Sequence, residues 1–352
     1  MFCRRIAERR GVPVAQVGKE LGARFDEILV VAEALLGLVA PGAVVRRLCL
    51  IAVPDQPGLL ALEQIELPRD DVPEPASPQH APRLVPRLAL LVRTWNVFHG
   101  NAVPPGRRSF LREMVKLASA DDPAVLCLQE LPVWSLPRLE EWSGMRSYGA
   151  VAARPQLGSA RLGGAITGLH RGFLRSAVTG QANAILLGPE LQPLAADSII
   201  LNPRGFRRAQ AHALRLDQRV ALAWAKERRV CHAVRLDAGG RFLTVANLHA
   251  SSVRDRRCQD GELLRAAVFA DAFAEPDDIV VLAGDFNTVI GESTTLDQLA
   301  SPSWGFSAPI PGLDQILVRG GEAPRPRPWP EDRRRLDGRL LSDHAPLETA
   351  IK

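Results

Sequence analysis

Short apolar runs typical of β-strands alternate with helical patterns from Leu88 to the end of the chain. Aliphatic residues fill runs such as LALLVRTWNV, AVLCLQEL and DIVVLAGDFN, whereas FLREMVKLA and LLRAAVFADAF repeat apolar residues every three or four positions. The first pattern is typical of buried strands and the second of helices that pack by one face. This region therefore predicts a single α/β domain at 88–352, with buried sheets covered by helices.

The first 87 residues follow a different pattern. Residues 1–45 repeat apolar side chains at helical spacing, and the runs RLCLIAV (47–53) and LLALEQIE (59–66) have the length of short strands. Residues 69–87 contain five prolines among polar residues, which is typical of a linker. We therefore expect a small helical or mixed region at 1–68 and a proline-rich linker at 69–87. The N-terminal region either binds nucleic acid or another partner, or is a helical appendage of the main domain.

Composition and charge exclude several classes of protein. The 352 residues are 46% hydrophobic and 24% charged, which is typical of a folded globular chain and excludes a disordered one. The formal net charge is +5, and nearly all of the basic residues are arginine, whose guanidinium binds phosphate through paired hydrogen bonds. This balance favours anionic partners without identifying them.

The cysteines and the apolar segments bear on location. The five cysteines are widely spaced and form no CxxC pair, which argues against a disulfide framework and a zinc site. Cys127 and Cys231 lie in apolar runs and are predicted to be buried thiols. The N-terminus lacks the apolar segment of a signal peptide, and the most apolar run, 28–45, contains Glu33 and Pro41. We expect a core helix there, no transmembrane segment and a cytoplasmic protein.

Polar side chains that can carry chemistry mark the ends of most apolar runs. A carboxylate, amide or imidazole stands at each of these positions: Asn96, Glu130, Asn247, His249, Asp285, Asn287, Asp314, Asp343 and His344. Each alone has an ordinary explanation, because Asp and Asn favour the turns that follow strands. Gathered at the ends of a sheet, such donors predict a site for a hard divalent cation, Mg²⁺ or Mn²⁺.

The chemistry that fits these residues is metal-assisted hydrolysis of a phosphate ester. A divalent cation takes up charge that develops on the phosphoryl oxygens, and an Asp–His pair can orient and deprotonate a water molecule. Amides and a second imidazole can donate hydrogen bonds to the transition state. The chain contains no GxxxxGK[ST] loop, no dinucleotide-binding fingerprint in context and no GxSxG elbow, which argues against the chemistries that those motifs serve.

Seven motifs occur in the order of a known superfamily. TWNVFHGN, LCLQEL, QANAIL, TVANLHASS, LAGDFNT, GLDQILV and LSDHAPL resemble the endonuclease/exonuclease/phosphatase superfamily, which has the fold of deoxyribonuclease I. The resemblance covers about residues 88–352. It implies an α/β fold, a four-layered sandwich in which two packed, mostly antiparallel β-sheets are flanked by helices, with the pocket at one edge.

The resemblance also implies roles for individual residues. Glu130 resembles the principal metal ligand, assisted by Asn96 and Asp343. His344 resembles the histidine that acts on the nucleophilic water, and Asp314 resembles the carboxylate that orients it.

The remaining predicted site residues concern the phosphate and the substrate. Asp285 and Asn287 resemble the residues that position the water or the phosphate, and His249 resembles the phosphate-contacting, general-acid histidine. Abasic-site endonucleases of the superfamily carry a tyrosine at the position of His249, and the single tyrosine, Tyr148, lies far from it in the sequence, which disfavours abasic-site repair. Four residues are predicted to bind substrate: Asn183, Asn247, Arg204 and Arg208.

A basic segment near the C-terminus also bears on the substrate. Between Arg325 and Arg339 the chain carries six arginines, three acids and Trp329, beside the SDH motif. Such a segment suits a nucleic-acid backbone or another polyanion. It is also compatible with a proline-stiffened loop whose charges pair internally.

These features favour a divalent-metal-dependent phosphodiesterase, specifically a nuclease that attacks a metal-bound phosphate with a His–Asp-activated water. A phosphomonoesterase and a lipid-headgroup phosphodiesterase, of the inositol-phosphatase or sphingomyelinase kind, are the enzymatic alternatives. The alternative outside enzymes is a non-catalytic binding protein, and the complete set of site residues speaks against it. The sequence leaves the physiological substrate and the oligomeric state open.

Overall fold

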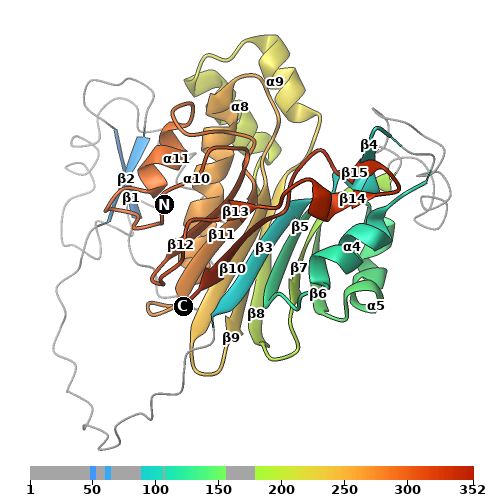
Figure 1. Cartoon of the computed structure of the whole chain (residues 1–352). Helices are drawn as coiled ribbons and strands as arrows, with labels where there is room; N and C mark the ends of the chain where they lie inside the picture. The colour runs from blue at the N-terminus through green and yellow to red at the C-terminus, as the bar shows by residue number, and fades with distance from the viewer. Residues whose placement is uncertain (1–47, 53–59, 65–88, 106–107, 156–178) are drawn as a thin grey trace, which may run out of the picture. The chain divides into compact units, whose positions relative to one another are not determined.

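A computed structural model describes residues 48–52, 60–64, 89–105, 108–155 and 179–352 (Figure 1). The helices expected in 1–45 and the linker expected at 69–87 lie outside the described residues. The described residues belong to two compact units. One includes 48–52, 60–64 and 204–217, and the other includes the described parts of 89–203 together with 218–352. The division expected after residues 68 and 87 stays a prediction.

The described residues of the first unit form two short strands and a helix. β1 (Leu48–Ala52) and β2 (Leu60–Gln64) pair antiparallel, so that Leu48 is opposite Gln64. The expectation of two short strands in this part of the chain is confirmed. The same unit includes α8 (Arg204–Ala213).

The second unit is built on two large sheets. The strands of the six-stranded sheet lie in the order β13 (Arg327–Pro328), β16 (Leu347–Ile351), β3 (Leu90–Asn96), β5 (Val125–Leu131), β7 (Gln181–Leu187) and β6 (Arg146–Ala153). Those of the five-stranded sheet lie in the order β12 (Asp314–Arg319), β11 (Ile279–Asp285), β10 (Phe242–His249), β9 (Val230–Asp237) and β8 (Gln192–Ile200). β3 pairs parallel with β5 and β10 with β11, whereas the other neighbours pair antiparallel.

Helices cover the outer faces of the two sheets (Figure 1). Those beside the six-stranded sheet are α4 (Leu111–Ser119) and α5 (Leu139–Ser143), and those beside the five-stranded sheet are α10 (Arg256–Phe273) and α11 (Thr294–Leu299). The remaining elements are α9 (Gln218–Ala225), the 3₁₀ turns η2 (Phe98–Gly100), η3 (Val133–Arg138) and η4 (Asp332–Arg334), and a small sheet of β14 (Arg335–Leu336), β15 (Arg339–Leu341) and β4 (Ala102–Val103).

Alternation of side chains along the strands explains the layers. In β5, Val125 and Cys127 point between the sheets, where they pack in one cluster with Val245 of β10. Leu126, one position along β5, points the other way and packs with Met114 of α4. Successive strand residues face opposite sides of a sheet, so a strand with both kinds of position filled by apolar residues is buried on both faces.

These layers confirm the predicted four-layered sandwich with two mostly antiparallel sheets. Cys127 and Cys231 are fully buried thiols, as predicted, and burial raises the pKa of each. Within the part of the chain that the structure describes, no helix is both long and apolar enough to cross a bilayer.

Candidate active site

The register of three neighbouring strands places three of the predicted residues side by side. His249 at the end of β10 is opposite Asp285 at the end of β11, and Asp285 is opposite Asp314, the first residue of β12. All three lie at one edge of the sheet because β10 and β11 are parallel and β12 runs in the opposite direction. Asn96 occupies the corresponding end of β3, where the parallel strand β5 places Gln129 opposite it.

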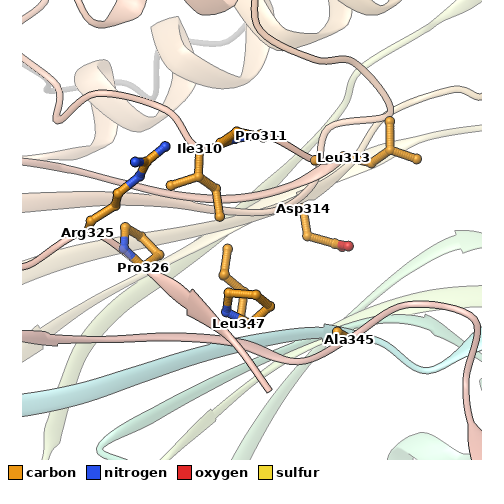
Figure 2. A pocket seen from close by; sticks show the side chains of 10 residues that line it. Ile310, Pro311, Leu313, Asp314, Arg325, Pro326, Ala345 and Leu347 are labelled. Atoms are coloured by element: carbon orange, nitrogen blue, oxygen red, sulfur yellow. The ribbon is translucent and has the colours of Figure 1, made fainter. Parts of the chain in front are cut away.

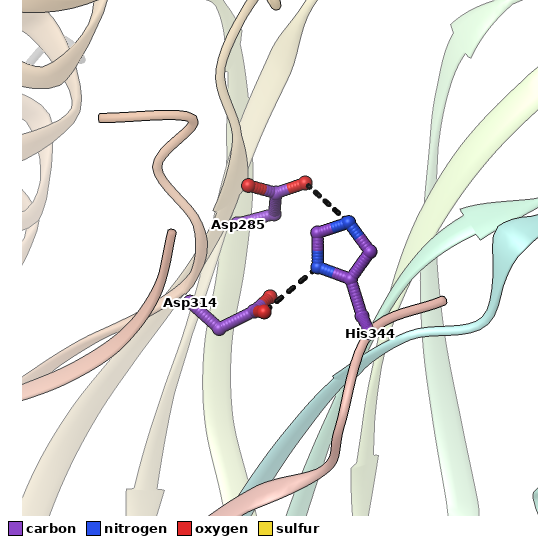
Figure 3. Close-up of side chains that lie close together, drawn as sticks. All are labelled: Asp285, Asp314 and His344. Carbon is purple, nitrogen blue, oxygen red and sulfur yellow. Dashed lines mark hydrogen bonds and ion pairs between the residues drawn. The ribbon is translucent and has the colours of Figure 1, made fainter. Parts of the chain in front are cut away.

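His344 reaches the same edge from the segment before β16. Its Nδ1 lies 2.7 Å from Asp314 Oδ2, which is a hydrogen bond, and its Nε2 lies 3.9 Å from Asp285 Oδ2 (Figure 3). One ligand atom from each of these three residues lies within 4.8 Å of the others. The bond to Asp314 fixes the imidazole ring so that Nε2 is directed at Asp285.

Burial and charge shift the pKa values within this group. Burial, followed by the charge of Asp314, raises the pKa of Asp285 to about 7. Burial by itself disfavours the His344 imidazolium, but the hydrogen bond and charge of Asp314, together with the charges of Asp285 and Asp343, raise the pKa of His344 to about 10. Asp314 therefore stabilises the charged form of the His344 ring.

Several buried donors hold the segment that carries His344. Arg334 Nη1 donates to the carbonyls of Leu341, Ser342 and His344 at 3.0–3.2 Å. The indole N–H of Trp95 donates to the His344 carbonyl at 2.9 Å. Ser342 Oγ donates to the carbonyl of Asn96 at 2.7 Å, which ties this segment to the end of β3. Side-chain hydrogen bonds to backbone carbonyls thus join this edge to the six-stranded sheet.

β5 presents Glu130 at an irregularity of the strand. The pairing of β5 with β7 changes register between Leu128 and Leu131, and Glu130 has a left-handed φ of 56°. Asn96 Nδ2 donates to Glu130 Oε1 at 3.3 Å and to Asp285 Oδ2 at 2.9 Å. Asn96 therefore connects the predicted metal ligand to the group around Asp285.

The donors around Glu130 fit a divalent cation. Glu130 Oε2 lies 3.6 Å from His99 Nε2, and Oε1 lies 3.7 Å from His249 Nε2. Both separations are too long for direct hydrogen bonds. The Glu130 side chain keeps 19% of its surface exposed. A carboxylate that solvent can reach, with imidazole nitrogens beyond hydrogen-bonding distance, has lone pairs available for a cation.

The two residues predicted to assist Glu130 are placed differently. Asn96 Oδ1 accepts the backbone N–H of Phe98 at 3.0 Å, so in this orientation the amide directs hydrogen atoms and not oxygen at Glu130. Asp343 is exposed, and its Oδ1 lies 3.4 Å from Ser342 Oγ. Their roles as metal ligands stay predictions.

His249 lies in surroundings that keep its ring neutral. Arg229 Nη1 lies 3.0 Å from Nδ1 and 3.1 Å from Nε2, and Gln181 Nε2 lies 3.1 Å from Nδ1. Burial, followed by the charge of Arg229, lowers the pKa of His249 well below its ordinary value. In its neutral form the ring can still donate a hydrogen bond to phosphate. The general-acid part of its predicted role stays a prediction.

Asn287 is anchored close to Asp285. Its backbone N–H donates to Asp285 Oδ1 at 2.9 Å, and its Nδ2 donates to the carbonyl of Ala250 at 2.9 Å. The backbone of Asn287 is left-handed, with φ 49°, a conformation that asparagine tolerates better than most residues. A contact between Asn287 and phosphate stays a prediction.

Two of the predicted substrate-binding residues, Asn247 and Asn183, lie inside the second unit. Asn247 is fully buried between the sheets, where Nδ2 donates to the carbonyls of Leu128 and Ala184 and Oδ1 accepts from Gln129. This placement argues against the predicted contact of Asn247 with substrate. Asn183 is also buried and donates to the Val230 carbonyl at 3.2 Å. Its role stays a prediction, as do the roles of two arginines on α8 in the first unit, Arg204 and Arg208.

A cavity of about 450 Å³ adjoins Asp314 (Figure 2). Three segments line it: residues 310–314, then Arg325, Pro326 and Pro328, and finally Ala345 and Leu347. The lining is mainly apolar, with Asp314 and Arg325 as its charged members. Arg325 is exposed and forms no ion pair with any residue that the structure describes. A substrate group beside the Asp314–His344 pair would have room here and an arginine to meet a negative charge.

Comparisons with known proteins agree with this geometry. The family model described as the Endonuclease/Exonuclease/phosphatase family matches residues 94–344. The chain belongs to this family. Its family membership confirms the resemblance seen in the seven motifs. A search of curated proteins finds no match.

Solved structures share the fold of this family member at low sequence identity. A functionally unknown conserved protein from Enterococcus faecalis V583 is 18% identical, with a TM-score of 0.53 over 75% of this chain and 99% of that chain. Humanized D. rerio TDP2, which carries 14 mutations, is 16% identical, with a TM-score of 0.52 over 75% and 99%. The endonuclease/exonuclease/phosphatase from Bacteroides vulgatus is 13% identical, with a TM-score of 0.53 over 76% and 99%. Identities this low show the fold alone.

The basic segment of this family member uses much of its charge internally. Arg333 pairs with Asp121 and Glu348, and Arg335 pairs with Glu331. Trp329 is buried, and its indole N–H donates to Glu348 at 2.7 Å. Trp329 is therefore not exposed for stacking on a base, contrary to the polyanion-binding interpretation of the segment.

Sequence reasoning missed two residues that lie at the site, Arg229 and His99. Arg229 precedes β9, and its guanidinium is buried against the ring of His249 and paired with Glu227. His99 follows β3 within the TWNVFHGN motif and faces Glu130. Both are polar residues next to the end of a strand. The same signal identified the other site residues in the sequence, so it could have identified these two as well.

Proposed function

We propose that this protein is a divalent-metal-dependent phosphodiesterase and that its substrates include nucleic acid. One observation carries the proposal: the His344–Asp314 hydrogen bond directs an imidazole nitrogen toward Asp285, at the edge where Glu130 also lies. Membership of the family supports phosphate-ester hydrolysis. The oxygen and nitrogen donors around Glu130 support the use of a cation.

In the proposed reaction, a water molecule attacks phosphorus and forms a new P–O bond while the ester P–O bond breaks. His344 Nε2 takes the proton of the attacking water, and Asp314 holds the ring and stabilises its positive charge. The leaving oxygen acquires a proton from solvent, so that the products are an alcohol and a phosphomonoester. Asp285 and Asn287 position the water or the phosphate.

Glu130 is the proposed ligand of the cation, with Asn96 and Asp343 as predicted assistants. When bound, Mg²⁺ or Mn²⁺ supplies positive charge that offsets charge on the phosphoryl oxygens and favours the neutral form of the neighbouring imidazole. His249 donates a hydrogen bond to a phosphoryl oxygen, and Arg229 holds its ring in place.

Exposed arginines favour a polyanionic substrate. Arg228 and Arg254 are exposed and form no ion pair within the described part of the chain. Arg228 adjoins Arg229, and Arg254 follows the strand that ends at His249. Positive side chains next to a phosphate site attract a nucleic-acid backbone. This observation supports nucleic acid over a small phosphate monoester.

The test compares diester and monoester substrates. Purified protein with Mg²⁺ or Mn²⁺ is offered plasmid DNA, RNA, bis-p-nitrophenyl phosphate and p-nitrophenyl phosphate. We expect turnover of the diesters. His344→Ala should lower kcat/KM by about 10²–10⁴-fold, the usual contribution of a positioned acid–base group. Glu130→Ala should also abolish most activity. His212→Ala, which removes an exposed histidine of the first unit, is the matched control and should retain activity.

Three results would contradict the proposal. Turnover of p-nitrophenyl phosphate alone would show a phosphomonoesterase. Turnover of a lipid-headgroup diester with none of DNA or RNA would exclude the nucleic-acid part. Full activity of both Glu130→Ala and His344→Ala would show that the reaction takes place elsewhere.

A further inference from the structure

The turn after β3 brings a histidine to the predicted metal ligand. His99 Nε2 lies 3.6 Å from Glu130 Oε2, and the His99 side chain is about nine-tenths buried, at 9% exposure. Two bonds of about 2.1 Å, typical of divalent cations with nitrogen and oxygen ligands, span at most roughly 4.2 Å. A cation can therefore bond to both atoms at the observed separation.

The backbone on both sides of this gap is left-handed at residues other than glycine. His99 has φ 52° and the preceding Phe98 has φ 45°, whereas Glu130 has φ 56°. Left-handed backbone is unfavourable at residues other than glycine and gathers at functional sites. The chain thus adopts an unfavourable conformation at the two residues that face each other.

Hydrogen bonds fix the turn in this conformation. Asn96 Oδ1 accepts the N–H of Phe98, and the Gly100 N–H donates to the Val97 carbonyl at 2.7 Å. The N–H of Phe110 then donates to the Gly100 carbonyl at 2.8 Å, which ties the turn to the start of α4. The backbone that carries His99 is thus held on both sides, and a preorganised backbone is what a metal ligand needs.

The second imidazole near Glu130 is a poorer donor to a cation. His249 Nε2 lies 3.7 Å from Glu130 Oε1, but Arg229 Nη1 lies 3.1 Å from the same nitrogen. A guanidinium is always positively charged and can only donate hydrogen bonds. A cation bonded to His249 would lie beside that charge. His99 Nε2 instead faces the carboxylate of Glu130, at 3.6 Å from Oε2.

We propose that His99 is a direct ligand of the divalent cation bound by Glu130, and that this nitrogen donor makes the site prefer Mn²⁺ over Mg²⁺. Imidazole is a good ligand for transition metals, whereas Mg²⁺ prefers oxygen ligands and retains its water molecules. The inference rests on the proposed function only in that both require a cation at Glu130.

The test reads the ligand nitrogen directly. Mn²⁺ bound to the full chain is examined by electron spin-echo envelope modulation, which detects nitrogen bonded to the ion. We expect ¹⁴N modulation in the natural protein and its replacement by ¹⁵N modulation when histidine alone is labelled with ¹⁵N. His99→Asn should remove it, because asparagine lacks the ring and tolerates a left-handed backbone better than most residues. Circular dichroism verifies that the variant is folded.

Metal affinity gives the second readout. Even the loss of a residue that only orients a metal ligand weakens affinity by about 10–100-fold. By calorimetric titration, we therefore expect His99→Asn to weaken Mn²⁺ binding at least about tenfold and to affect Mg²⁺ binding less. His249→Gln is the matched variant at the other imidazole, and it should retain the nitrogen modulation.

Clear outcomes would overturn the inference. These are nitrogen modulation that persists in folded His99→Asn, modulation lost only in His249→Gln, or Mn²⁺ bound without any histidine nitrogen. Hydrolysis of bis-p-nitrophenyl phosphate without nitrogen modulation would overturn the role of His99 and leave the proposed function intact. Nitrogen modulation without turnover of any phosphate ester would support the role of His99 and overturn the proposed function.

Discussion

Gly284 allows two strands to approach closely just before Asp285. A Cβ at this position would lie 1.9 Å from the carbonyl oxygen of Leu248 on the neighbouring strand β10, and φ is 136°. No side chain fits at that distance, and the φ angle is one that side chains disfavour. The fold therefore requires glycine at this position of the GDFN motif, because only glycine allows the strand ends that carry His249 and Asp285 to lie this close.

Gly284→Ala should destabilise the protein far more than the same substitution at a glycine whose added Cβ would meet no other atom. We expect a loss of about 3–5 kcal/mol in the free energy of unfolding, because backbone must move to relieve the overlap. Gly144→Ala is the control, since φ is 72° and nothing lies within 4 Å of the added Cβ. Its cost should be about 1–2 kcal/mol. Equal costs in urea denaturation would contradict this explanation.

At the scale of elements, the candidate site depends on a segment without regular structure. The stretch between β15 and β16 carries Asp343 and His344 and is held by Arg334, Trp95 and Ser342. Arg334 is buried, and its Nη1 donates to the carbonyls of Ser342 and His344 in this stretch and to that of Leu341 at the end of β15. The position of His344 relative to Asp314 therefore depends on Arg334, which is not itself one of the residues proposed to take part in the reaction.

Arg334→Lys should loosen this segment. An ammonium on a flexible stem cannot reproduce the planar guanidinium, and a misplacement of about 1 Å at a catalytic group can cost roughly 10²-fold in rate. We expect a fall in kcat and faster amide hydrogen exchange over 341–344. Arg335→Lys, at an exposed arginine paired with Glu331, is the control. If the two variants show the same kcat and the same hydrogen exchange, Arg334 does not position His344.

At the scale of the second unit, an ionic network joins segments from the two ends of the domain. Arg93 on β3 is fully buried and donates to Asp121, after α4, and to Glu348, on β16. The guanidinium of Arg93 lies 4.4 Å from the ring of Trp329, and that of Arg333 lies 3.5 Å from it. Because the guanidinium of Arg93 has no exposure to solvent, loss of a partner would leave a charge without compensation.

This network predicts a stability that depends on pH. The hydrogen bond from Arg93 lowers the pKa of Asp121 from 3.8 to about 2, outweighing the effect of burial. A carboxylate with a lowered pKa in the folded state stabilises above its unfolded pKa, and this contribution is lost as pH falls. The free energy of unfolding should therefore fall between about pH 4 and pH 2. Asp121→Asn should flatten that part of the curve, whereas Asp277→Asn, at an exposed carboxylate, should not.

The exposed arginines near the site make a prediction for the substrate at the same scale. Arg228→Ala combined with Arg254→Ala should weaken DNA binding and leave turnover of bis-p-nitrophenyl phosphate unchanged, because the small diester has no flanking phosphates. The slope of log affinity against log salt should decrease by about 1 for each lost phosphate contact. An unchanged slope in fluorescence anisotropy would show that neither arginine contacts the backbone.

Apolar runs in the sequence predicted the strands β3, β5 and β11, because such runs are local properties of the chain. Asp285 and Asp314, nearly thirty residues apart in the printed sequence, were both recognised as strand-end residues. Their adjacency depends on β11 pairing with β12, which no local pattern determines. Asn247 illustrates the converse: two positions before His249 on the same face, it lies deeper between the sheets and bonds to β5 and β7.

The sequence by itself determined the α/β class through side-chain period, and the family, with the four-layered fold that it implies, through the order of the motifs. It also determined the residue types at the strand ends, because all of these are written along the chain. Only the tertiary structure decided which of those side chains meet. It brings His344 to Asp314 and His99 to Glu130, buries Trp329 against Glu348, and sets Arg229 against the ring of His249. Such contacts depend on strand register and on how two sheets pack, and those are properties of the folded chain as a whole.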